Sequence, residues 1–228
     1  MKYTEEFVGI KTKHIHEFNS LHEFNNYIMN TPINNIFKNE SLASISGNKK
    51  FAGTNSFDEA MDLFKNGWST MAEEIELKLK VTKNQIQPKT TRRSYFDVTG
   101  FQASVPRYLQ GIPTNMVNQK SVVQKQKVIT FNKDISYSAC TSKETIIDSS
   151  IKALQIIKQV EAQGIRCNLN LIWGVYAHTE MNVTKIKLKS ANERLNISKI
   201  AFPLVHPSML RRLLFRYEEV CPTFTKRE

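Results

Sequence analysis

The stretch from Lys127 to Tyr176 constrains the fold more than any other part of the sequence. It opens with Val128–Phe131, a short run of β-branched and aromatic residues that is typical of a strand. Thr141 and Glu144 stand at capping-box spacing, and an apolar stripe continues to Gly164, where further strand-forming residues begin. The pattern predicts two parallel strands joined by a helix, and therefore an α/β sheet.

We expect a single open, mostly parallel sheet flanked by helices. The length of 228 residues favours one compact domain. Within it, we expect residues 1–80 to be a helical N-terminal part and residues 81–127 to be a basic, loop-rich excursion. Residues 128–228 then make up the α/β core unit with its C-terminal helix.

Local signals place several elements within these parts. A helix is expected to begin near Ser20, and a second one is capped by Ser56 and Glu59 and ends at Gly67. In the core unit, Val183–Leu188 alternates apolar residues with lysines, which is typical of a solvent-facing or edge strand.

Cysteine spacing and hydropathy exclude several classes of protein. The three cysteines lie far apart with no CxxC pair, which argues against a zinc module and against a disulfide framework. The N-terminus lacks the apolar region of a signal peptide, and no window approaches the apolar length of a membrane span. We therefore expect reduced thiols, a cytoplasmic location and no membrane partner.

Motifs that carry catalysis are absent from the sequence. There is no GxSxG, GxxxxGK[ST], GxGxxG or HExxH. The sequence therefore favours a non-enzymatic binding protein over an enzyme, and predicts no organic cofactor.

The net charge of +11 is distributed unevenly along the chain. Residues 78–127 hold ten lysines and arginines against one acid, whereas residues 1–77 hold seven against eleven. Positive charge interleaved with aromatic rings suits phosphate contacts and base stacking. The candidate nucleic-acid-binding residues here are Lys89, Arg92, Arg93, Tyr95, Lys120, Lys125 and Lys127. Two simpler interpretations stay open: the basic segment keeps the chain in solution, or it lies on the acidic N-terminal part.

The closing helix after Pro207 has two faces when drawn at the ordinary helical period. The face expected to be buried consists of Leu210, Leu213, Leu214 and Tyr217. The opposite face, which we add to the candidate surface for nucleic acid or another polyanion, consists of Arg211, Arg212 and Arg216.

The loop after the first core strand carries an acid and two hydroxyls at alternate positions, Asp134, Ser136 and Ser138. It stands where open α/β sheets bind ligands, outside the carboxyl end of a strand. Oxygen ligands of this kind suit hard cations, so the loop is a candidate site for Mg²⁺ or Mn²⁺. The alternative is a serine-rich loop that caps the next helix.

Three stretches, in their order and spacing, resemble an uncharacterised family of proteins encoded by tailed bacteriophages. They contain FAG, SFDEA and GW in residues 51–68, VPRYLQGIP with a following Met in residues 105–116, and AFPLVHPSMLRR in residues 201–212. The resemblance covers about residues 50 to 220. It implies a phage origin and action in the cytoplasm of the host cell, and it brings no established activity.

Residues 127–176 also resemble von Willebrand factor A-type domains, in which an Asp-x-Ser-x-Ser loop holds a divalent cation. Asp134, Ser136 and Ser138 match that loop. Clear downstream Thr and Asp loops are missing from this sequence, with Thr179 as a candidate only. The resemblance implies an alternative function, a protein-interaction module that acts on a host or virion partner.

Overall fold

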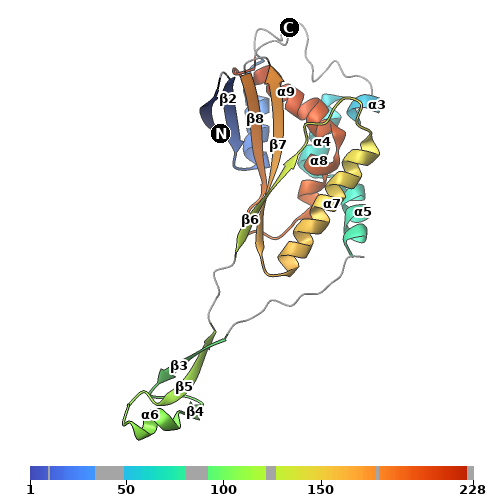
Figure 1. Ribbon diagram of the computed structural model, residues 1–228. Coiled ribbons are helices and arrows are strands. Elements are labelled where there is room, and N and C mark those ends of the chain that lie inside the picture. Colours follow the sequence, from blue (N-terminus) through green and yellow to red (C-terminus); the bar gives the residue numbers. More distant parts are fainter. Residues whose placement is uncertain (10, 34–48, 81–91, 122–126, 178–179, 225–228) are drawn as a thin grey trace.

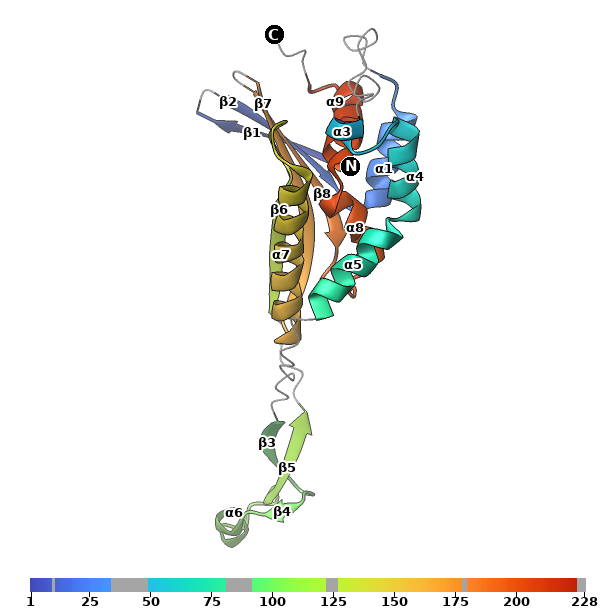
Figure 2. The same cartoon turned by 90° about the vertical axis from the view of Figure 1, so that its right-hand side faces the viewer.

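The computed structural model describes residues 1–9, 11–33, 49–80, 92–121, 127–177 and 180–224. They form two parts that stand apart in Figures 1 and 2. The body consists of all described residues outside 92–121, and the module consists of residues 92–121.

A five-stranded mixed sheet forms the centre of the body, in the order β1-β2-β8-β7-β6. Its strands are β1 (Lys2–Val8), β2 (Lys11–Phe18), β6 (Val128–Asp134), β7 (Arg166–Ala177) and β8 (Glu180–Lys189). The predicted parallel pair is confirmed: β6 lies beside β7, and α7 (Lys143–Ala162) joins them.

The expectation of a mostly parallel sheet is wrong. The pairs β6–β7 and β2–β8 are parallel, whereas β1–β2 and β7–β8 are antiparallel. Only two residues separate β7 from β8, and only two separate β1 from β2. Connections that short cannot make the crossover that a parallel pair needs.

The N-terminal part is helical only after its first eighteen residues. There follow α1 (Leu21–Asn30), α3 (Lys49–Ala52), α4 (Phe57–Asn66) and α5 (Ser69–Lys80). The expected caps are present, since the hydroxyl of Ser56 accepts from the Glu59 amide and Gly67 has a φ of 81°. The β1–β2 hairpin was missed because every residue of β1 is exposed, so that no alternation of buried and polar positions marks it.

The helices gather on one side of the sheet (Figure 2). The C-terminal elements α8 (Ile197–Val205), η2 (Met209–Leu214) and α9 (Phe215–Val220) lie among them. Every residue from Ile200 to Leu214 is buried, and Tyr217 lies at the centre of a cluster of aromatic rings that includes Phe18, Phe24, Trp173 and Phe224. The four apolar residues expected to be buried on the closing helix are buried. No helix within the described ranges is long and apolar enough to cross a membrane.

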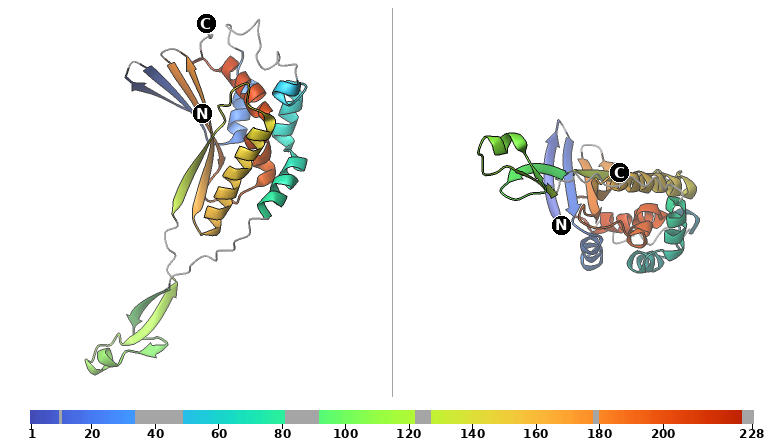
Figure 3. Two further views of the ribbon diagram at one scale, coloured as in Figure 1. Left: turned by 45° about the vertical axis from the view of Figure 1, so that its right-hand side comes forward. Right: turned by 90° about the horizontal axis from the view of Figure 1, so that it is seen from below.

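Residues 92–121 form a small antiparallel sheet where a loop-rich excursion was expected. Its strands are β3 (Arg92–Asp97), β4 (Gln102–Ala103) and β5 (Met116–Ser121), in the order β3-β5-β4, and α6 (Val105–Leu109) follows β4. Gly100 makes the turn into β4 possible, because a Cβ there would lie 2.3 Å from the Val117 carbonyl oxygen. Figure 3 shows the module projecting beyond one end of the body.

Candidate functional site

The module exposes an unusual amount of apolar surface for its size. None of the residues 94–119 is buried. Its large apolar side chains with exposed fractions of 40–78% are Tyr95, Phe96, Val98, Phe101, Val105, Tyr108 and Leu109. Large exposed apolar side chains that gather into one patch mark a place where another molecule binds, so the module is a candidate binding region.

Arg107 fastens α6 to the small sheet. Its guanidinium lies 4.0 Å from the centre of the Phe96 ring and donates to the Thr114 carbonyl at 2.9 Å. The contact holds α6 against the face of the sheet that carries Phe96. The helix α6 does not cover the opposite face of the small sheet. The sequence did not predict which of the two faces α6 would cover.

Three of the predicted binding residues come together at one end of the module. Arg93 lies directly opposite Lys120 in the β3–β5 pair, and Tyr95 lies opposite Asn118 two residues further along. Residues directly opposite each other share a face, as do residues two apart on one strand. Arg93, Lys120 and Tyr95 therefore occupy one face of the small sheet, and it is the face away from Phe96.

The other candidates in the basic segment are placed differently. Arg92 pairs with Ser121, one position along from Arg93, and therefore belongs to the opposite face. Lys127 is exposed and directly precedes β6 in the body. Lys89 and Lys125 lie outside the described residues.

The expectation that Arg211 and Arg212 lie on a solvated face is wrong, since 5% and 1% of their surfaces are exposed. Arg211 donates to the carbonyl of Phe51, and Arg212 donates to the hydroxyl and carbonyl of Thr54. Burial lowers the pKa of both guanidinium groups. Both therefore fasten residues 51–54 to the core.

Arg216 lies in α9 and is half-buried, and its Nη1 pairs with buried Glu219 at 3.2 Å, so its place in a polyanion surface stays a prediction. Two features explain the error for Arg211 and Arg212. The face that carries them is covered by elements from the N-terminal part, and residues 209–214 form a π-helix. A wheel drawn at the α-helical period misplaces the side chains of such a segment.

The loop after β6 is held by its own polar groups. The Asp134 carboxylate accepts from the Ser136 amide at 2.8 Å, and the Ser136 hydroxyl accepts from the Gly174 amide at 2.8 Å. The Ser138 hydroxyl accepts from the Cys140 amide at 3.3 Å. These bonds form a tight turn that joins the loop to β7.

The turn does not present its three oxygens as a preformed cation site. One oxygen of the Asp134 carboxylate and the hydroxyl oxygens of Ser136 and Ser138 each accept a backbone hydrogen bond, and Asp134 is the only carboxylate in the set. The described residues contain no group of three or more His, Cys, Asp or Glu arranged to hold a metal. Binding of Mg²⁺ or Mn²⁺ at Asp134 stays a prediction, and the candidate ligand Thr179 lies outside the described residues.

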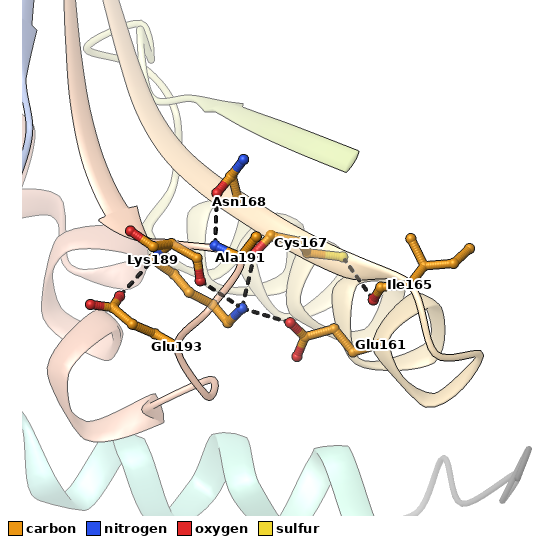
Figure 4. Close-up of polar contacts among 8 residues, drawn as sticks. Glu161, Ile165, Cys167, Asn168, Lys189, Ala191 and Glu193 are labelled. Carbon is orange, nitrogen blue, oxygen red and sulfur yellow. Dashed lines mark hydrogen bonds and ion pairs between the residues drawn. The ribbon is translucent and has the colours of Figure 1, made fainter. Parts of the chain in front are cut away.

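A third buried cation, Lys189, lies at the other end of β7 from the Asp134 loop, and Figure 4 shows its contacts. Lys189 is 2% exposed and donates to the Glu161 carboxylate at 2.6 Å and to the Cys167 carbonyl at 2.9 Å. Of the two alternatives predicted for residues 183–188, the edge strand is wrong, because β8 lies between β2 and β7. The predicted alternation is present, since Ile186 and Leu188 are buried whereas Lys185 and Lys187 are only half-buried. Lys189 is fully satisfied and has a structural role.

No curated protein and no solved structure is significantly similar to the chain. One family model matches residues 4–227, and the family is described as a domain of unknown function, DUF7192. The match includes the N-terminal hairpin and the module as well as the core unit. Because it covers nearly the whole chain, the protein belongs to the DUF7192 family.

Proposed function

We propose that this protein binds single-stranded nucleic acid through the module, without catalysis and with little sequence preference. The observation that carries the proposal is the placement of Arg93 opposite Lys120, with Tyr95 next along the same face. Two like charges directly opposite each other in an antiparallel pair destabilise the sheet. A phosphate between them would convert that repulsion into two attractions.

An aromatic residue of the module complements these charges. Tyr95 is 40% exposed on the same face as Arg93 and Lys120, and it offers a ring on which a base can stack. Stacking of this kind tolerates any base, because every base has a π face. Phosphate contacts from the basic residues would supply the remaining affinity.

The module also lacks the negative charge that would repel a phosphate backbone. Asp97 is the single acid among residues 78–127. Its carboxylate already accepts from the Val98 amide at 2.7 Å, at the end of β3 away from Arg93. The charge along the rest of the segment is positive.

The proposal extends to the origin of the protein. The stretches in residues 51–68, 105–116 and 201–212 that resemble tailed-bacteriophage proteins suggest a phage gene, and therefore action in the cytoplasm of an infected bacterium. The last stretch lies in the buried core of the body, and the middle one contains α6 of the module. The nucleic acid encountered there would be that of the phage or its host.

A second candidate function is the binding of a host or virion protein. The seven exposed apolar side chains of the module favour it, because stable protein interfaces bury aromatic and aliphatic anchors. The von Willebrand factor A-type resemblance adds the Asp134 loop as a further contact for such a partner. This candidate depends on apolar burial, so it predicts weak dependence on salt.

A salt titration tests the proposal. A labelled single strand of about 20 nucleotides is titrated with the protein at rising salt, and the slope of log affinity against log salt is measured. Arg93→Gln with Lys120→Gln should lower the magnitude of that slope by about 0.7, since the one phosphate held between the two side chains contributes about 0.7 on a single strand. The matched control is Lys152→Gln with Lys158→Gln, which removes the same charge from the exposed surface of α7. Absence of binding at low salt, or equal slopes in both variants, would reject the nucleic-acid proposal.

A further inference from the structure

A cleft of about 400 Å³ lies in the body, where β6 ends and β7 continues. The last residue of β6 that pairs with β7 is Asp134, and the chain then turns through Ser136 and Tyr137 along one wall. Its apolar lining consists of Phe51, Trp173, Val175, Leu210 and Phe215. A concave cavity of this size with a mostly apolar lining is typical of a small-molecule site.

One buried charge lies on the wall of this cleft, that of Arg211. Its Nη1 donates to the Phe51 carbonyl at 2.6 Å, and its Nη2 lies 3.3 Å from the carbonyl oxygens of Ala139 and Thr141. The guanidinium carbon also lies 4.3 Å from the centre of the Phe51 ring. These contacts fix the plane of the guanidinium and bring no negative charge to it.

Within the described part of the chain, no carboxylate lies within ion-pair distance of Arg211. Burial lowers its pKa, and no acid acts in the opposite direction. Lys189, the buried cation at the other end of the sheet, has Glu161 at 2.6 Å. Removing an unpaired charge from water is costly. A bound anion beside the Arg211 guanidinium would offset that cost.

Arg211 also keeps hydrogen-bonding capacity for such a partner. A guanidinium has five N–H groups, and the two nitrogens that donate here leave the Nε–H and one Nη1–H without an acceptor among the described residues. Ser136, on the same cleft, accepts from the Gly174 amide at 2.8 Å through its oxygen. Its own O–H can still donate.

We propose that the cleft binds a small organic anion, a flat ring that carries one phosphate or carboxylate group. The anionic group would accept from Arg211 and Ser136, and the ring would lie against the aromatic wall. A ligand of this class would pair with the positive charge of Arg211 and would also cover the apolar lining of the cleft. The site lies in the body, so it stands independently of the proposed function of the module.

Calorimetric titration of the full chain tests this site. The probes are phenyl phosphate, benzoate and adenosine monophosphate, with benzamide and adenosine as neutral counterparts. We expect at least one anion to bind at least about tenfold more tightly than its neutral counterpart, which corresponds to about 1.4 kcal/mol. Preference for the phosphates identifies a nucleotide-like ligand, and preference for benzoate identifies a carboxylate.

Two variants locate the bound anion. Arg211→Lys keeps a positive charge but loses the fork that holds an anion with two bonds, and should weaken binding at least about tenfold. Ala139→Phe adds a ring to an exposed residue that lines the cleft, keeps the backbone carbonyl to which Arg211 donates, and should abolish binding. The matched control is Ala103→Phe, at an exposed alanine of the module, and it should bind like the unmodified chain. Equal binding of charged and neutral probes, no binding of any probe, or unchanged affinity in folded Ala139→Phe would overturn the proposal.

Discussion

The body and the module differ in how much of their residue surface is buried. In the body, an unbroken run from Ile200 to Leu214 is buried, polar residues included. In the module, none of the residues 94–119 is buried, and large apolar side chains face water. Ordering a residue costs about 1–2 kcal/mol of backbone entropy, and the module has far less buried apolar surface than the body to offset that cost.

This difference separates structure from function within one chain. Residues whose loss would unfold the protein are concentrated in the C-terminal elements, and residues that can be changed without loss of the fold are concentrated in the module. A small sheet of three strands needs a covered apolar face to be stable by itself. The module therefore gains most from a partner that covers it.

The largest difference between the two parts should appear in a pair of leucine variants. Leu213 is 0% exposed in η2, and Leu213→Ala should lower the free energy of unfolding by about 2–5 kcal/mol, because transfer and cavity terms add. Leu109 is 78% exposed in α6, and Leu109→Ala should change it by no more than about 0.5 kcal/mol. Urea denaturation of both variants measures the two effects, and similar losses would mean that the module has a core of its own.

Two buried histidines should make the stability of the body depend on pH. Burial lowers the pKa of His16 and of His206 from 6.5 to about 4, with His14 and Lys143 acting in the same direction. The unfolded chain therefore binds more protons than the folded chain between these pH values. Stability should be fully present above about pH 6.5 and should be lost as the pH falls toward 4, by roughly 2 kcal/mol from each histidine between pH 7 and pH 5.

His206 offers a direct check on this pH dependence. Its Nδ1 accepts from the Ser208 amide at 3.1 Å, so a proton on Nδ1 would break that bond. In His206→Gln, the loss of stability between pH 7 and pH 5 should shrink by roughly 2 kcal/mol, whatever the stability at pH 7. A pH profile parallel to that of the unmodified chain would show that His206 does not titrate in this way.

The smallest effect on stability is expected at the Arg93–Lys120 pair. Replacing Lys120 by Glu turns a like-charge pair into an opposite-charge pair, which should stabilise the small sheet by about 0.2–1 kcal/mol. Hydrogen exchange of the β3 and β5 amides measures that gain. The same variant should bind nucleic acid more weakly, so improved binding would contradict the assigned role of the pair.

Local signals in the sequence predicted much of the body. The Ser56 cap, the positive φ of Gly67 and the β6–α7–β7 unit follow from short-range rules that the structure obeys. The burial of Arg211 and Arg212 could not be predicted in this way. It depends on residues 51–54, which lie about 160 positions away in the sequence and supply the carbonyl and hydroxyl oxygens that satisfy both side chains.

The sequence predicted the charged composition of the candidate binding surface. It did not predict how the residues of that surface are arranged in space. Charge counts alone pointed to residues 78–127. The pairing of Arg93 with Lys120 depends on the register of β3 and β5, which the turn at Gly100 and the helix between β4 and β5 determine. The cleft beside Arg211 is assembled from α3, the loop after β6, β7, η2 and α9, so no single stretch of sequence marks it.

Excision of the module tests the central claim most directly. Arg92 and Ser121 lie opposite each other at the base of the small sheet, with Cα atoms about 5 Å apart, so a short Gly-Ser linker can replace residues 92–121. Binding of a labelled single strand and thermal unfolding are then measured on the shortened and the unmodified chain. We predict an unchanged unfolding temperature and a loss of nucleic-acid affinity of at least about a hundredfold. Retained affinity in the shortened chain would contradict the assignment of the binding surface to the module.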